Sequence, residues 1–358
     1  MKLFIDIGHP AHVHYFKNLI QRLKVKGHSV IVSSRDKEMA QYLLQQLNLE
    51  YFNRGKGASG IIGKVLYTIT ADYDLYKIAR REKPDFFLSF ASPYCAHVSS
   101  MLRKPHIAID DTENATFGQM LYRPFTNHIL TPDCFKKDFG KKQMRFPSYM
   151  ELSYLHPNVF NPNDSIYEYL GIEKNEKYCV LRFVGWGAVH DIGHKGLTLE
   201  NKINAVREFS KFCKVFISSE SKLPDKLKKY ELNIPKHRIH DVLAFSSMFY
   251  GESATMASES AVLGVPAVYL DNEGRGYTDE QEHKYGLVFN YTESESDQLK
   301  SIEKGVEILK TNKESHWSDK RTNLLNDKID LTAFLEYFIE NYPASTVGSK
   351  EYFKKYSY

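Results

Sequence analysis

The feature that most constrains the fold is an alternation of short apolar runs with longer stretches of helical periodicity. In the first half, the apolar runs predict buried strands, and apolar residues spaced three and four apart predict helices between them. This alternation is typical of βαβ units and of a parallel sheet. The predicted strands are Leu3–Ile7, Ser29–Ser33, Asp85–Ser89, His106–Ile109 and His128–Leu130.

One predicted helix, Ile61–Arg80, carries an apolar stripe that we expect to face the core. The stripe consists of Ile62, Val65, Leu66, Ile69, Tyr73 and Tyr76. A second helix, Tyr15–Lys24, follows the first strand directly.

A proline-rich connector separates this half from a second one of the same kind. Segment 146–162 holds three prolines and has no clear periodicity, which is typical of an interdomain connection. Beyond it, further strands are predicted at Tyr178–Phe183, Lys214–Ser218, Met248–Tyr250 and Ala267–Leu270. We therefore expect an α/β protein with two Rossmann-like domains, residues 1–160 and 165–315. C-terminal helices over 316–358 are expected to pack back toward the first domain.

Composition excludes several classes of protein. A length of 358 residues fits two domains, and 48 basic against 44 acidic residues give a net charge of +4, too balanced to imply nucleic-acid binding. The four cysteines form no closely spaced pair, which argues against a disulfide framework or a zinc ribbon and fits a reducing cytoplasm. No apolar run approaches the ~20 residues of a membrane span, so we expect any membrane role to be peripheral.

Two pairs of lysines suggest where such a peripheral contact would lie. Lys136-Lys137 and Lys141-Lys142 occur close to Phe135, Phe139 and Phe146. This pattern fits contact with an anionic membrane that carries a lipid-linked acceptor, or the solvated face of a helix.

The most informative window for function is 248–270, which predicts a strand, a turn of small residues, a helix and another strand. The turn brings backbone close to a ligand, and the helix offers unpaired N–H groups and the positive end of its dipole to a phosphate. Ser253 and Thr255 add hydroxyl groups, and Glu259 is suited to accept hydrogen bonds from a ribose diol. Alternatively, Ser253 or Thr255 is only a helix cap.

The sequence GESATMASESAVLGVP in this window resembles the nucleotide-sugar signature of GT-B glycosyltransferases and UDP-N-acetylglucosamine 2-epimerases. The resemblance implies that Ser253, Ala254 and Thr255 contact the diphosphate and that Glu259 binds the ribose. The preceding segment resembles the part that contacts the base, which makes Ile239 and His240 candidates there.

The loop after the first strand is rich in histidine. His9, His12 and His14 lie where a Rossmann-type sheet binds its ligands, without a GxGxxG motif for a dinucleotide. His12 is the preferred catalytic base, and His9 and His14 are candidates for contact with the sugar or the acceptor. A metal site and a structural role remain alternatives, although the HxxHxH spacing matches no common zinc pattern.

Three further loops follow predicted strands. The loop after Tyr178–Phe183 holds Arg182 at its start, then His190 and Lys195, as candidates for contact with the diphosphate or the sugar. Asp111 and Glu113 follow a strand of the first half as candidate catalytic acids. Later candidates for the sugar or acceptor are Tyr277 and Gln281. A solvated polar loop is the alternative in each case.

The opening IGHPAHVHYFKNLI, the connector YMELSYLHPNVFNP and the block GESATMASESAVLGVPAV together resemble domain-of-unknown-function family 354, a GT-B-like family. The resemblance implies two Rossmann-like domains with parallel sheets facing a central cleft. It also implies a nucleotide-sugar donor, UDP-linked, and a glycan or lipid-linked acceptor, as in surface glycan biosynthesis.

Three activities stay open at this point: transfer of the sugar, a 2-epimerase or sugar-nucleotide hydrolase reaction, and non-catalytic binding. Epimerases of this kind carry an acid after the third core strand, where this chain has Ser89–Pro93 without one. We therefore favour a cytoplasmic glycosyltransferase. It is expected to need no metal and no cofactor, because no DxD-like pair follows a strand of the second half.

Overall fold

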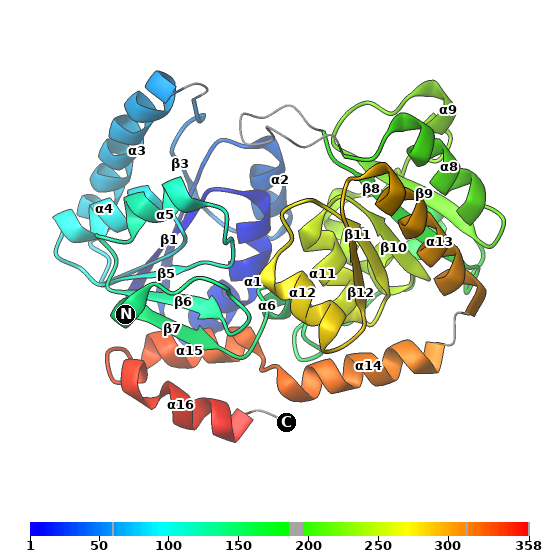
Figure 1. The fold of residues 1–358 in the computed structure, drawn as a ribbon. Coiled ribbons are helices and arrows are strands. Elements are labelled where there is room, and N and C mark those ends of the chain that lie inside the picture. The colour runs from blue at the N-terminus through cyan, green and yellow to red at the C-terminus, as the bar shows by residue number, and fades with distance from the viewer. Residues whose placement is uncertain (59–60, 186–195, 312–313, 357–358) are drawn as a thin grey trace. The chain divides into compact units, whose positions relative to one another are not determined.

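The computed structural model describes residues 1–58, 61–185, 196–311 and 314–356 and divides the chain into two units (Figure 1). The first unit comprises Met1–Val159 together with the chain from Lys328 onward. The second comprises Phe160–Asp327. Each unit is built around its own parallel sheet.

The described residues of the first unit form a seven-stranded sheet in the order β3-β2-β1-β4-β5-β6-β7, parallel at every described pairing. The strand order reverses between β1 and β4, and ligands of such sheets bind outside the carboxyl ends of the strands at this switch point. The strands are β1 (Lys2–Ile7), β2 (Ser29–Ser34), β3 (Phe52–Asn53), β4 (Phe86–Phe90), β5 (His106–Ile109), β6 (His128–Pro132) and β7 (Gln143–Phe146).

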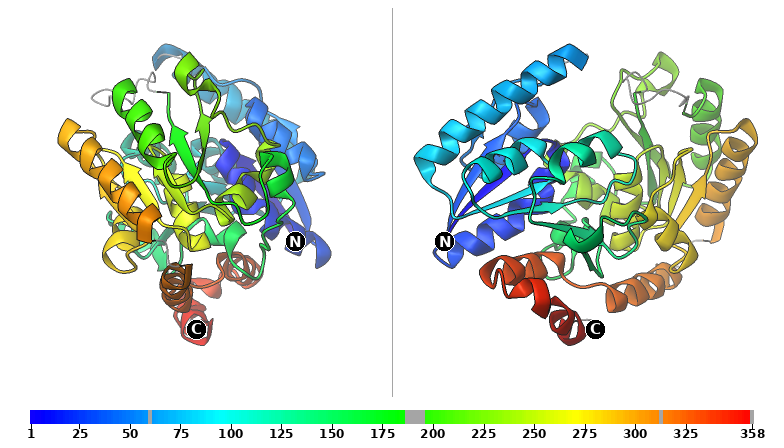
Figure 2. Two further views of the ribbon diagram at one scale, coloured as in Figure 1. Left: turned by 90° about the vertical axis from the view of Figure 1, so that its right-hand side faces the viewer. Right: turned by 60° about the vertical axis from the view of Figure 1, so that its left-hand side comes forward.

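Two groups of helices pack on this sheet (Figures 1 and 2). One group is α3 (Ile61–Glu82), α4 (Pro93–Met101) and α5 (Thr116–Tyr122), and the other is α1 (Pro10–Val25), α2 (Glu38–Gln46), α6 (Leu152–Leu155) and α15 (Leu331–Glu340). The core beneath α3 and α4 includes Phe4, Leu75, Phe87 and Val98, all fully buried. Because both faces are covered, the central strands β1, β4 and β5 are buried and mostly apolar, as the sequence pattern predicts.

Helix α1 begins immediately after β1 and carries the histidines. Pro10 is well placed in the first turn, where no backbone N–H is needed, and the His9 side chain caps the helix by accepting from the N–H of Ala11. Its buried face consists of Val13, Tyr15, Phe16, Leu19, Ile20 and Leu23.

The apolar stripe predicted on α3 is wrong at Ile69 and Tyr73, whereas Tyr76 packs against the core as predicted. Ile69 and Tyr73 are 63% and 61% exposed, whereas Ala71, Leu75 and Ala79 are buried. The helix has apolar residues on more than one face, and the sheet selects the face whose alanines allow close approach. Side chains of Ile62, Val65 and Leu66 lie outside the described residues.

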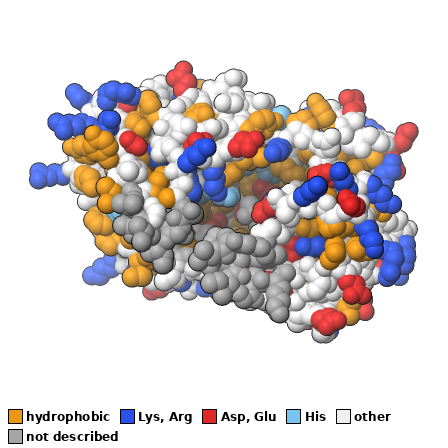
Figure 3. Space-filling view, turned by 90° about the horizontal axis from the view of Figure 1, so that it is seen from above, with side chains coloured by type: hydrophobic (Ala, Val, Ile, Leu, Met, Phe, Trp, Pro, Cys, Tyr) orange, Lys and Arg blue, Asp and Glu red, His pale blue; other side chains and the backbone are white. Residues whose placement is uncertain are grey.

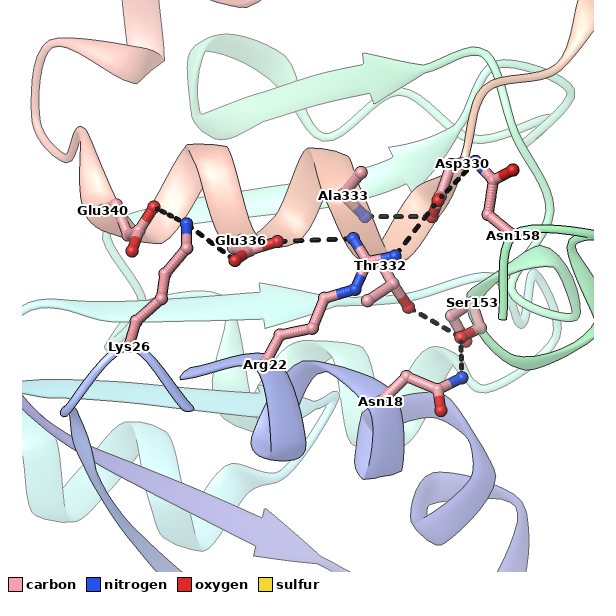
Figure 4. A network of polar contacts seen from close by, with 10 residues as sticks. All are labelled: Asn18, Arg22, Lys26, Ser153, Asn158, Asp330, Thr332, Ala333, Glu336 and Glu340. Atoms are coloured by element: carbon pink, nitrogen blue, oxygen red, sulfur yellow. Dashed lines mark hydrogen bonds and ion pairs between the residues drawn. The ribbon is translucent and has the colours of Figure 1, made fainter. Parts of the chain in front are cut away.

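Polar contacts fix α15 to α1 and α6 within the first unit (Figure 4). Asp330 caps α15 through the N–H of Ala333 and accepts from Arg22 Nη2 and Asn158 Nδ2. The backbone oxygen of Ser153 accepts from Asn18 and Thr332. The last helix, α16 (Ser345–Tyr356), packs on α15 through Tyr352, which stacks on Tyr337 at 4.5 Å between ring centroids.

The second unit has a five-stranded sheet in its described residues, in the order β12-β11-β10-β8-β9. Its strands are β8 (Tyr178–Phe183), β9 (Lys214–Ser219), β10 (Met248–Gly251), β11 (Ala267–Leu270) and β12 (Val288–Tyr291). Its switch point lies between β8 and β10, where Arg182 and Gly251 are register partners.

Two groups of helices pack on this sheet. One group is α8 (Leu199–Phe209) with α13 (Glu295–Thr311), and the other is α10 (Ile239–Ala244), α11 (Ala254–Leu263), α12 (Gly276–His283) and α14 (Glu314–Asp327). Two short helices, α7 (Ile166–Leu170) and α9 (Asp225–Lys228), complete the unit.

The sequence led us to expect that residues 316–358 pack together on the first domain. The structure instead divides these residues between the two units. Helix α14 belongs to the second unit, where Arg321 Nε donates to the backbone oxygen of Val262 and Lys320 Nζ to that of Gly286. The chain changes unit at Lys328.

Figure 3 shows the charged side chains on one face of the molecule. Lys and Arg side chains are interspersed with Asp and Glu over the face shown in Figure 3. Among the described helices, none combines the length and apolar character that a membrane crossing requires.

Candidate functional site

The turn after β10 has a backbone that only glycine allows. Gly251 has φ +157°, and a Cβ built on it would lie 2.2 Å from the backbone oxygen of Arg182 on β8. Ser253 then caps α11, its Oγ accepting from the N–H of Met256 at 3.3 Å. Ala254 and Thr255 form the first turn of the helix, whose N–H groups have no acceptor within the helix. The predicted capping role of Ser253 is therefore confirmed, and the helix end has the form that binds anions.

Glu259 lies one turn into α11, paired with His240 of α10. His240 Nε2 and Glu259 Oε1 are 2.9 Å apart, and both side chains are buried. Neighbouring Ile239 begins α10 and is half-buried. His240 is thus placed to orient Glu259, a role different from the base contact that the sequence suggested.

Glu252 is a residue of this turn whose role the sequence did not reveal. Its buried carboxylate accepts from the backbone N–H of Val184 at 2.9 Å and of Leu197 at 2.5 Å, and Lys202 Nζ is 3.7 Å away. It therefore holds both described ends of the loop that follows β8. The predicted His190 and Lys195 lie within that loop, outside the described residues.

Arg182, the penultimate residue of β8, has its charge already paired. Its Nη1 donates to Ser218 Oγ at 2.8 Å and its Nη2 to Glu220 Oε1 at 2.6 Å, both at the end of β9. In this arrangement the guanidinium stabilises the β8–β9 edge, which makes it less available to neutralise a diphosphate.

Tyr277 and Gln281 lie on α12, a helix where the sequence suggested a polar loop. Gln281 is fully buried, and its Nε2 donates to Ser258 Oγ on α11 at 2.8 Å. Tyr277 is 8% exposed. Gln281 therefore fastens α12 to α11, and the expected contact with a sugar is not supported by its position in the core.

The three histidines of the first unit lie on the start of α1 with different neighbours. His12 packs against Phe90 at 4.8 Å and Tyr15 at 6.0 Å between ring centroids. The ring of His14 contacts that of Tyr154, and His9 is the helix cap. His12 is the one at the switch point between β1 and β4.

The geometry of His12 argues against the predicted role of general base. The backbone N–H of Gly8 donates to His12 Nδ1 at 3.2 Å, so that nitrogen carries no proton. Burial, with the nearby positive charges of His9, Arg54 and Lys37, lowers the pKa of His12 well below its usual range and keeps the ring neutral. A neutral ring with an accepting Nδ1 carries its proton on Nε2, which makes that atom a donor.

The acids after β5 have separate surroundings. Asp110 is fully buried and accepts from Tyr122 Oη at 2.6 Å and from the N–H of Thr112 at 2.9 Å. Asp111 accepts from Thr112 Oγ1, and Glu113 accepts from the backbone N–H of Lys136. Of the two predicted catalytic acids, Glu113 thus braces the loop after β6, while Asp111 lies directly beyond the strand.

Asp110 gives the first unit a stability that depends on pH. Burial raises its pKa to about 6, above the value of about 3.8 in an unfolded chain. The folded state therefore binds the proton more tightly, and stability falls as the pH rises from 4 to 6, by about 2 kcal/mol. We expect Asp110→Asn to remove this slope, measured by hydrogen exchange of the β5 and β6 amides. The exposed Asp138→Asn should keep it, and an unchanged slope in Asp110→Asn would contradict the assignment.

Two arginines of the first unit form a site that the sequence analysis missed. Arg54, just after β3, pairs with Asp6 of β1 at 2.9 Å, both side chains being almost fully buried. Arg35, just after β2, lies with Arg54 around the ring of Tyr67, at 5.8 and 5.9 Å from its centroid. The run Arg54-Gly55-Lys56-Gly57 was the available signal, but a strand of two residues gave no apolar run to mark it.

The lysine pairs do not form the predicted membrane contact. Phe135, Phe139 and Phe146 are buried, and Lys137 Nζ donates to Thr116 Oγ1 and Gln119 Oε1. Lys142 Nζ donates to the backbone oxygen of Arg123. The segment lies in a loop and a 3₁₀ turn, so the alternative of a helix face is wrong as well.

Sequence comparison gives a family for most of the chain. The model of a family described as "Protein of unknown function (DUF354)" matches residues 1–280. An uncharacterized protein of Methanocaldococcus jannaschii is 23% identical over 278 residues, which is 75% of this chain and 81% of that protein.

Structure comparison finds two kinds of enzyme with this fold. UDP-GlcNAc 2-epimerase from Neisseria meningitidis, bound to UDP-GlcNAc, matches with a TM-score of 0.69 and 12% identity over 95% of this chain and 100% of that chain. The SsfS6 glycosyltransferase of Streptomyces sp. SF2575 matches with a TM-score of 0.59 and 13% identity over 94% and 99%. At these identities the likeness shows the fold, which is of the GT-B kind in its two parallel-sheet units.

Proposed function

The chain belongs to the DUF354 family, and we propose that it is a nucleotide-sugar-dependent enzyme that transfers a sugar from a UDP-linked donor to an acceptor hydroxyl. The observation that carries the proposal is the buried Glu259–His240 pair, one turn behind the capped N-terminus of α11. The helix end would bind the diphosphate, and the Glu259 carboxylate would bind the ribose. The two groups follow each other along α11 in the same order as diphosphate and ribose in a nucleotide.

Preorganisation supports this role for Glu259. A buried carboxylate held by a histidine keeps its orientation before the ligand arrives, so less ordering is required on binding. Gly251 also contributes to this preorganisation, because it allows the turn to lie against β8 at the switch point of the second sheet.

The first unit would supply the acceptor side of the reaction. His12 Nε2 would donate a hydrogen bond to the developing negative charge, and Asp111 would accept the proton of the acceptor hydroxyl. No metal or cofactor enters this proposal, since the helix end of α11 is the proposed stabiliser of the leaving diphosphate.

An epimerase reaction is the second candidate. UDP-GlcNAc 2-epimerases are among the structural matches, and Asp111 would be available to it as one acid. The segment after β4 has no carboxylate: Ser92 caps α4 there and donates to Asp6. Conversion of UDP-GlcNAc in the absence of an acceptor would favour the epimerase reaction over sugar transfer.

Calorimetric titration with UDP tests the nucleotide site. We expect Glu259→Ala to weaken UDP binding about tenfold or more, because the proposed ribose acceptor is lost. His240→Ala should also weaken it, and the double variant should be no weaker than Glu259→Ala alone, since His240 acts through Glu259. The exposed Glu303→Ala of α13 is the control. UDP affinity in Glu259→Ala equal to that of the control would remove α11 from the nucleotide site.

A further inference from the structure

Two guanidinium groups in the first unit lie near one aromatic ring. Arg35 and Arg54 both flank Tyr67, and Asp6 is hydrogen-bonded to Arg54 alone of the two. Asp6 also accepts from Ser33 Oγ at 2.7 Å and Ser92 Oγ at 2.5 Å, so its negative charge is shared. The cluster therefore carries excess positive charge in a partly desolvated place, which favours an anion.

Arg54 is held rigidly with one nitrogen left over. Its residue is 3% exposed, its Nε donates to Asp6 and its Nη1 to Tyr67 Oη at 2.5 Å, while its guanidinium carbon lies 4.9 Å from the Tyr94 ring centroid. Nη2 has no hydrogen-bond partner among the described residues. It lies 3.6 Å from the position of a Cβ on Gly8, at the carboxyl end of β1.

Arg35 contributes a second unused donor. Its Nε is buried and has no hydrogen-bond partner in the described part of the chain. Gly57 crosses directly over this guanidinium, since a Cβ there would lie 1.7 Å from Arg35 Nη2. Glycine thus allows the guanidinium of Arg35 to lie against the backbone at this position, and no acidic side chain among the described residues forms an ion pair with it.

His12, at the start of α1, lies beside Arg54. Its ring borders the same space beside Gly8, with Cε1 3.7 Å from the position of the Cβ. Arg54 and His12 thus meet at the carboxyl end of β1, next to the N-terminus of a helix of 16 residues and the switch point of the first sheet.

We propose that the two guanidinium groups, Arg35 and Arg54, bind an oxyanion, phosphate or carboxylate, carried by the acceptor, which leaves the one donor of His12 for the reaction itself. Planar guanidinium groups suit both anions because they donate two parallel hydrogen bonds. The assignment to the acceptor rests on the proposed function, whereas the anion site itself rests on the first unit alone. The acceptor is accordingly an acidic glycan or a phosphate-bearing one.

The test is titration of the whole chain with inorganic phosphate, followed calorimetrically with UDP present in excess to occupy the second unit. We expect Arg35→Gln to weaken phosphate binding about fivefold to tenfold, with the exposed Arg80→Gln of α3 as the matched control. Arg35 forms no ion pair with the described residues, so its replacement leaves the Asp6–Arg54 pair intact. A second variant, Asp6→Asn with Arg54→Gln, removes that pair without leaving a buried charge.

Glucose 1-phosphate and glucuronate then separate the two sources of the anion, since tighter binding of either identifies the acidic group of the acceptor. Equal phosphate affinity in Arg35→Gln and Arg80→Gln, or no phosphate binding by the unaltered chain, would overturn the proposal. Failure of the proposed function has a different result, because calorimetric titration with UDP then gives no heat of binding. The same phosphate titration without UDP still compares Arg35→Gln with Arg80→Gln.

Discussion

Replacing Gly251 with alanine is expected to lower the free energy of unfolding of the second unit by about 4 kcal/mol. The added Cβ would lie 2.2 Å from the backbone oxygen of Arg182 and 2.9 Å from its backbone nitrogen. Both atoms belong to β8, a strand paired on both sides, so neither can move without breaking ladder hydrogen bonds. The hydrogen bond from the N–H of Glu252 to Arg182 would be lost with the shift.

Tryptophan fluorescence in a urea titration measures this change. Trp317, which is 8% exposed, lies on α14 in the second unit, so its emission reports on that unit. Gly185→Ala is the matched control, because a Cβ there meets Ser221 and Glu220 only at ordinary contact distances of 3.7 and 3.8 Å. Equal midpoints for the two variants would show that the close approach of β10 to β8 does not hold in solution.

The central strands could be predicted from the sequence, whereas of the four edge strands only β9 could be. Predicted and observed bounds of β1, β5, β8 and β11 differ by at most one residue at either end, because strands covered on both faces read as continuous apolar runs. The missed strands, β3, β7 and β12, all lie at sheet edges. Edge strands are partly exposed, so polar residues interrupt the run.

Helices posed a different difficulty. Helix α14 lies almost wholly within 316–358, where helices were predicted, but its own apolar periodicity is weak and it is held by polar contacts such as that of Arg321 with Val262. On α3 the apolar periodicity was present, yet Ile69 and Tyr73 are exposed. Periodicity thus predicts that a helix exists more reliably than which of its faces is buried.

The residues of the candidate site also differ in how far they could be predicted from the sequence. Ser253 and Glu259 were predictable because one strand–turn–helix motif holds both in a short window. The partnership of Arg54 with Asp6 joins residues far apart in sequence, and that of Glu259 with His240 depends on the packing of α10 on α11. Such pairings are decided by the fold, and residue type alone does not reveal them.

The second large effect is expected at His12, where two substitutions separate a hydrogen-bond donor from a base. His12→Ala should lower kcat for release of UDP from the donor by about 10² to 10³, because a donor to developing negative charge is lost. His12→Gln should retain activity within about tenfold, since a glutamine amide reaches the position of Nε2 and donates there. Glutamine cannot take up a proton, so a base at this position would make both variants equally inactive.

The pH dependence of kcat provides an independent readout. Because burial and neighbouring positive charges lower the pKa of His12, its ring is neutral throughout the neutral range. The donor on Nε2 is then present without any titration, as long as the N–H of Gly8 occupies Nδ1. Any acidic limb of the profile should therefore be the same in His12→Gln as in the unaltered enzyme. Loss of such a limb in that variant would restore His12 as the base and would require the ring to release Gly8 during turnover.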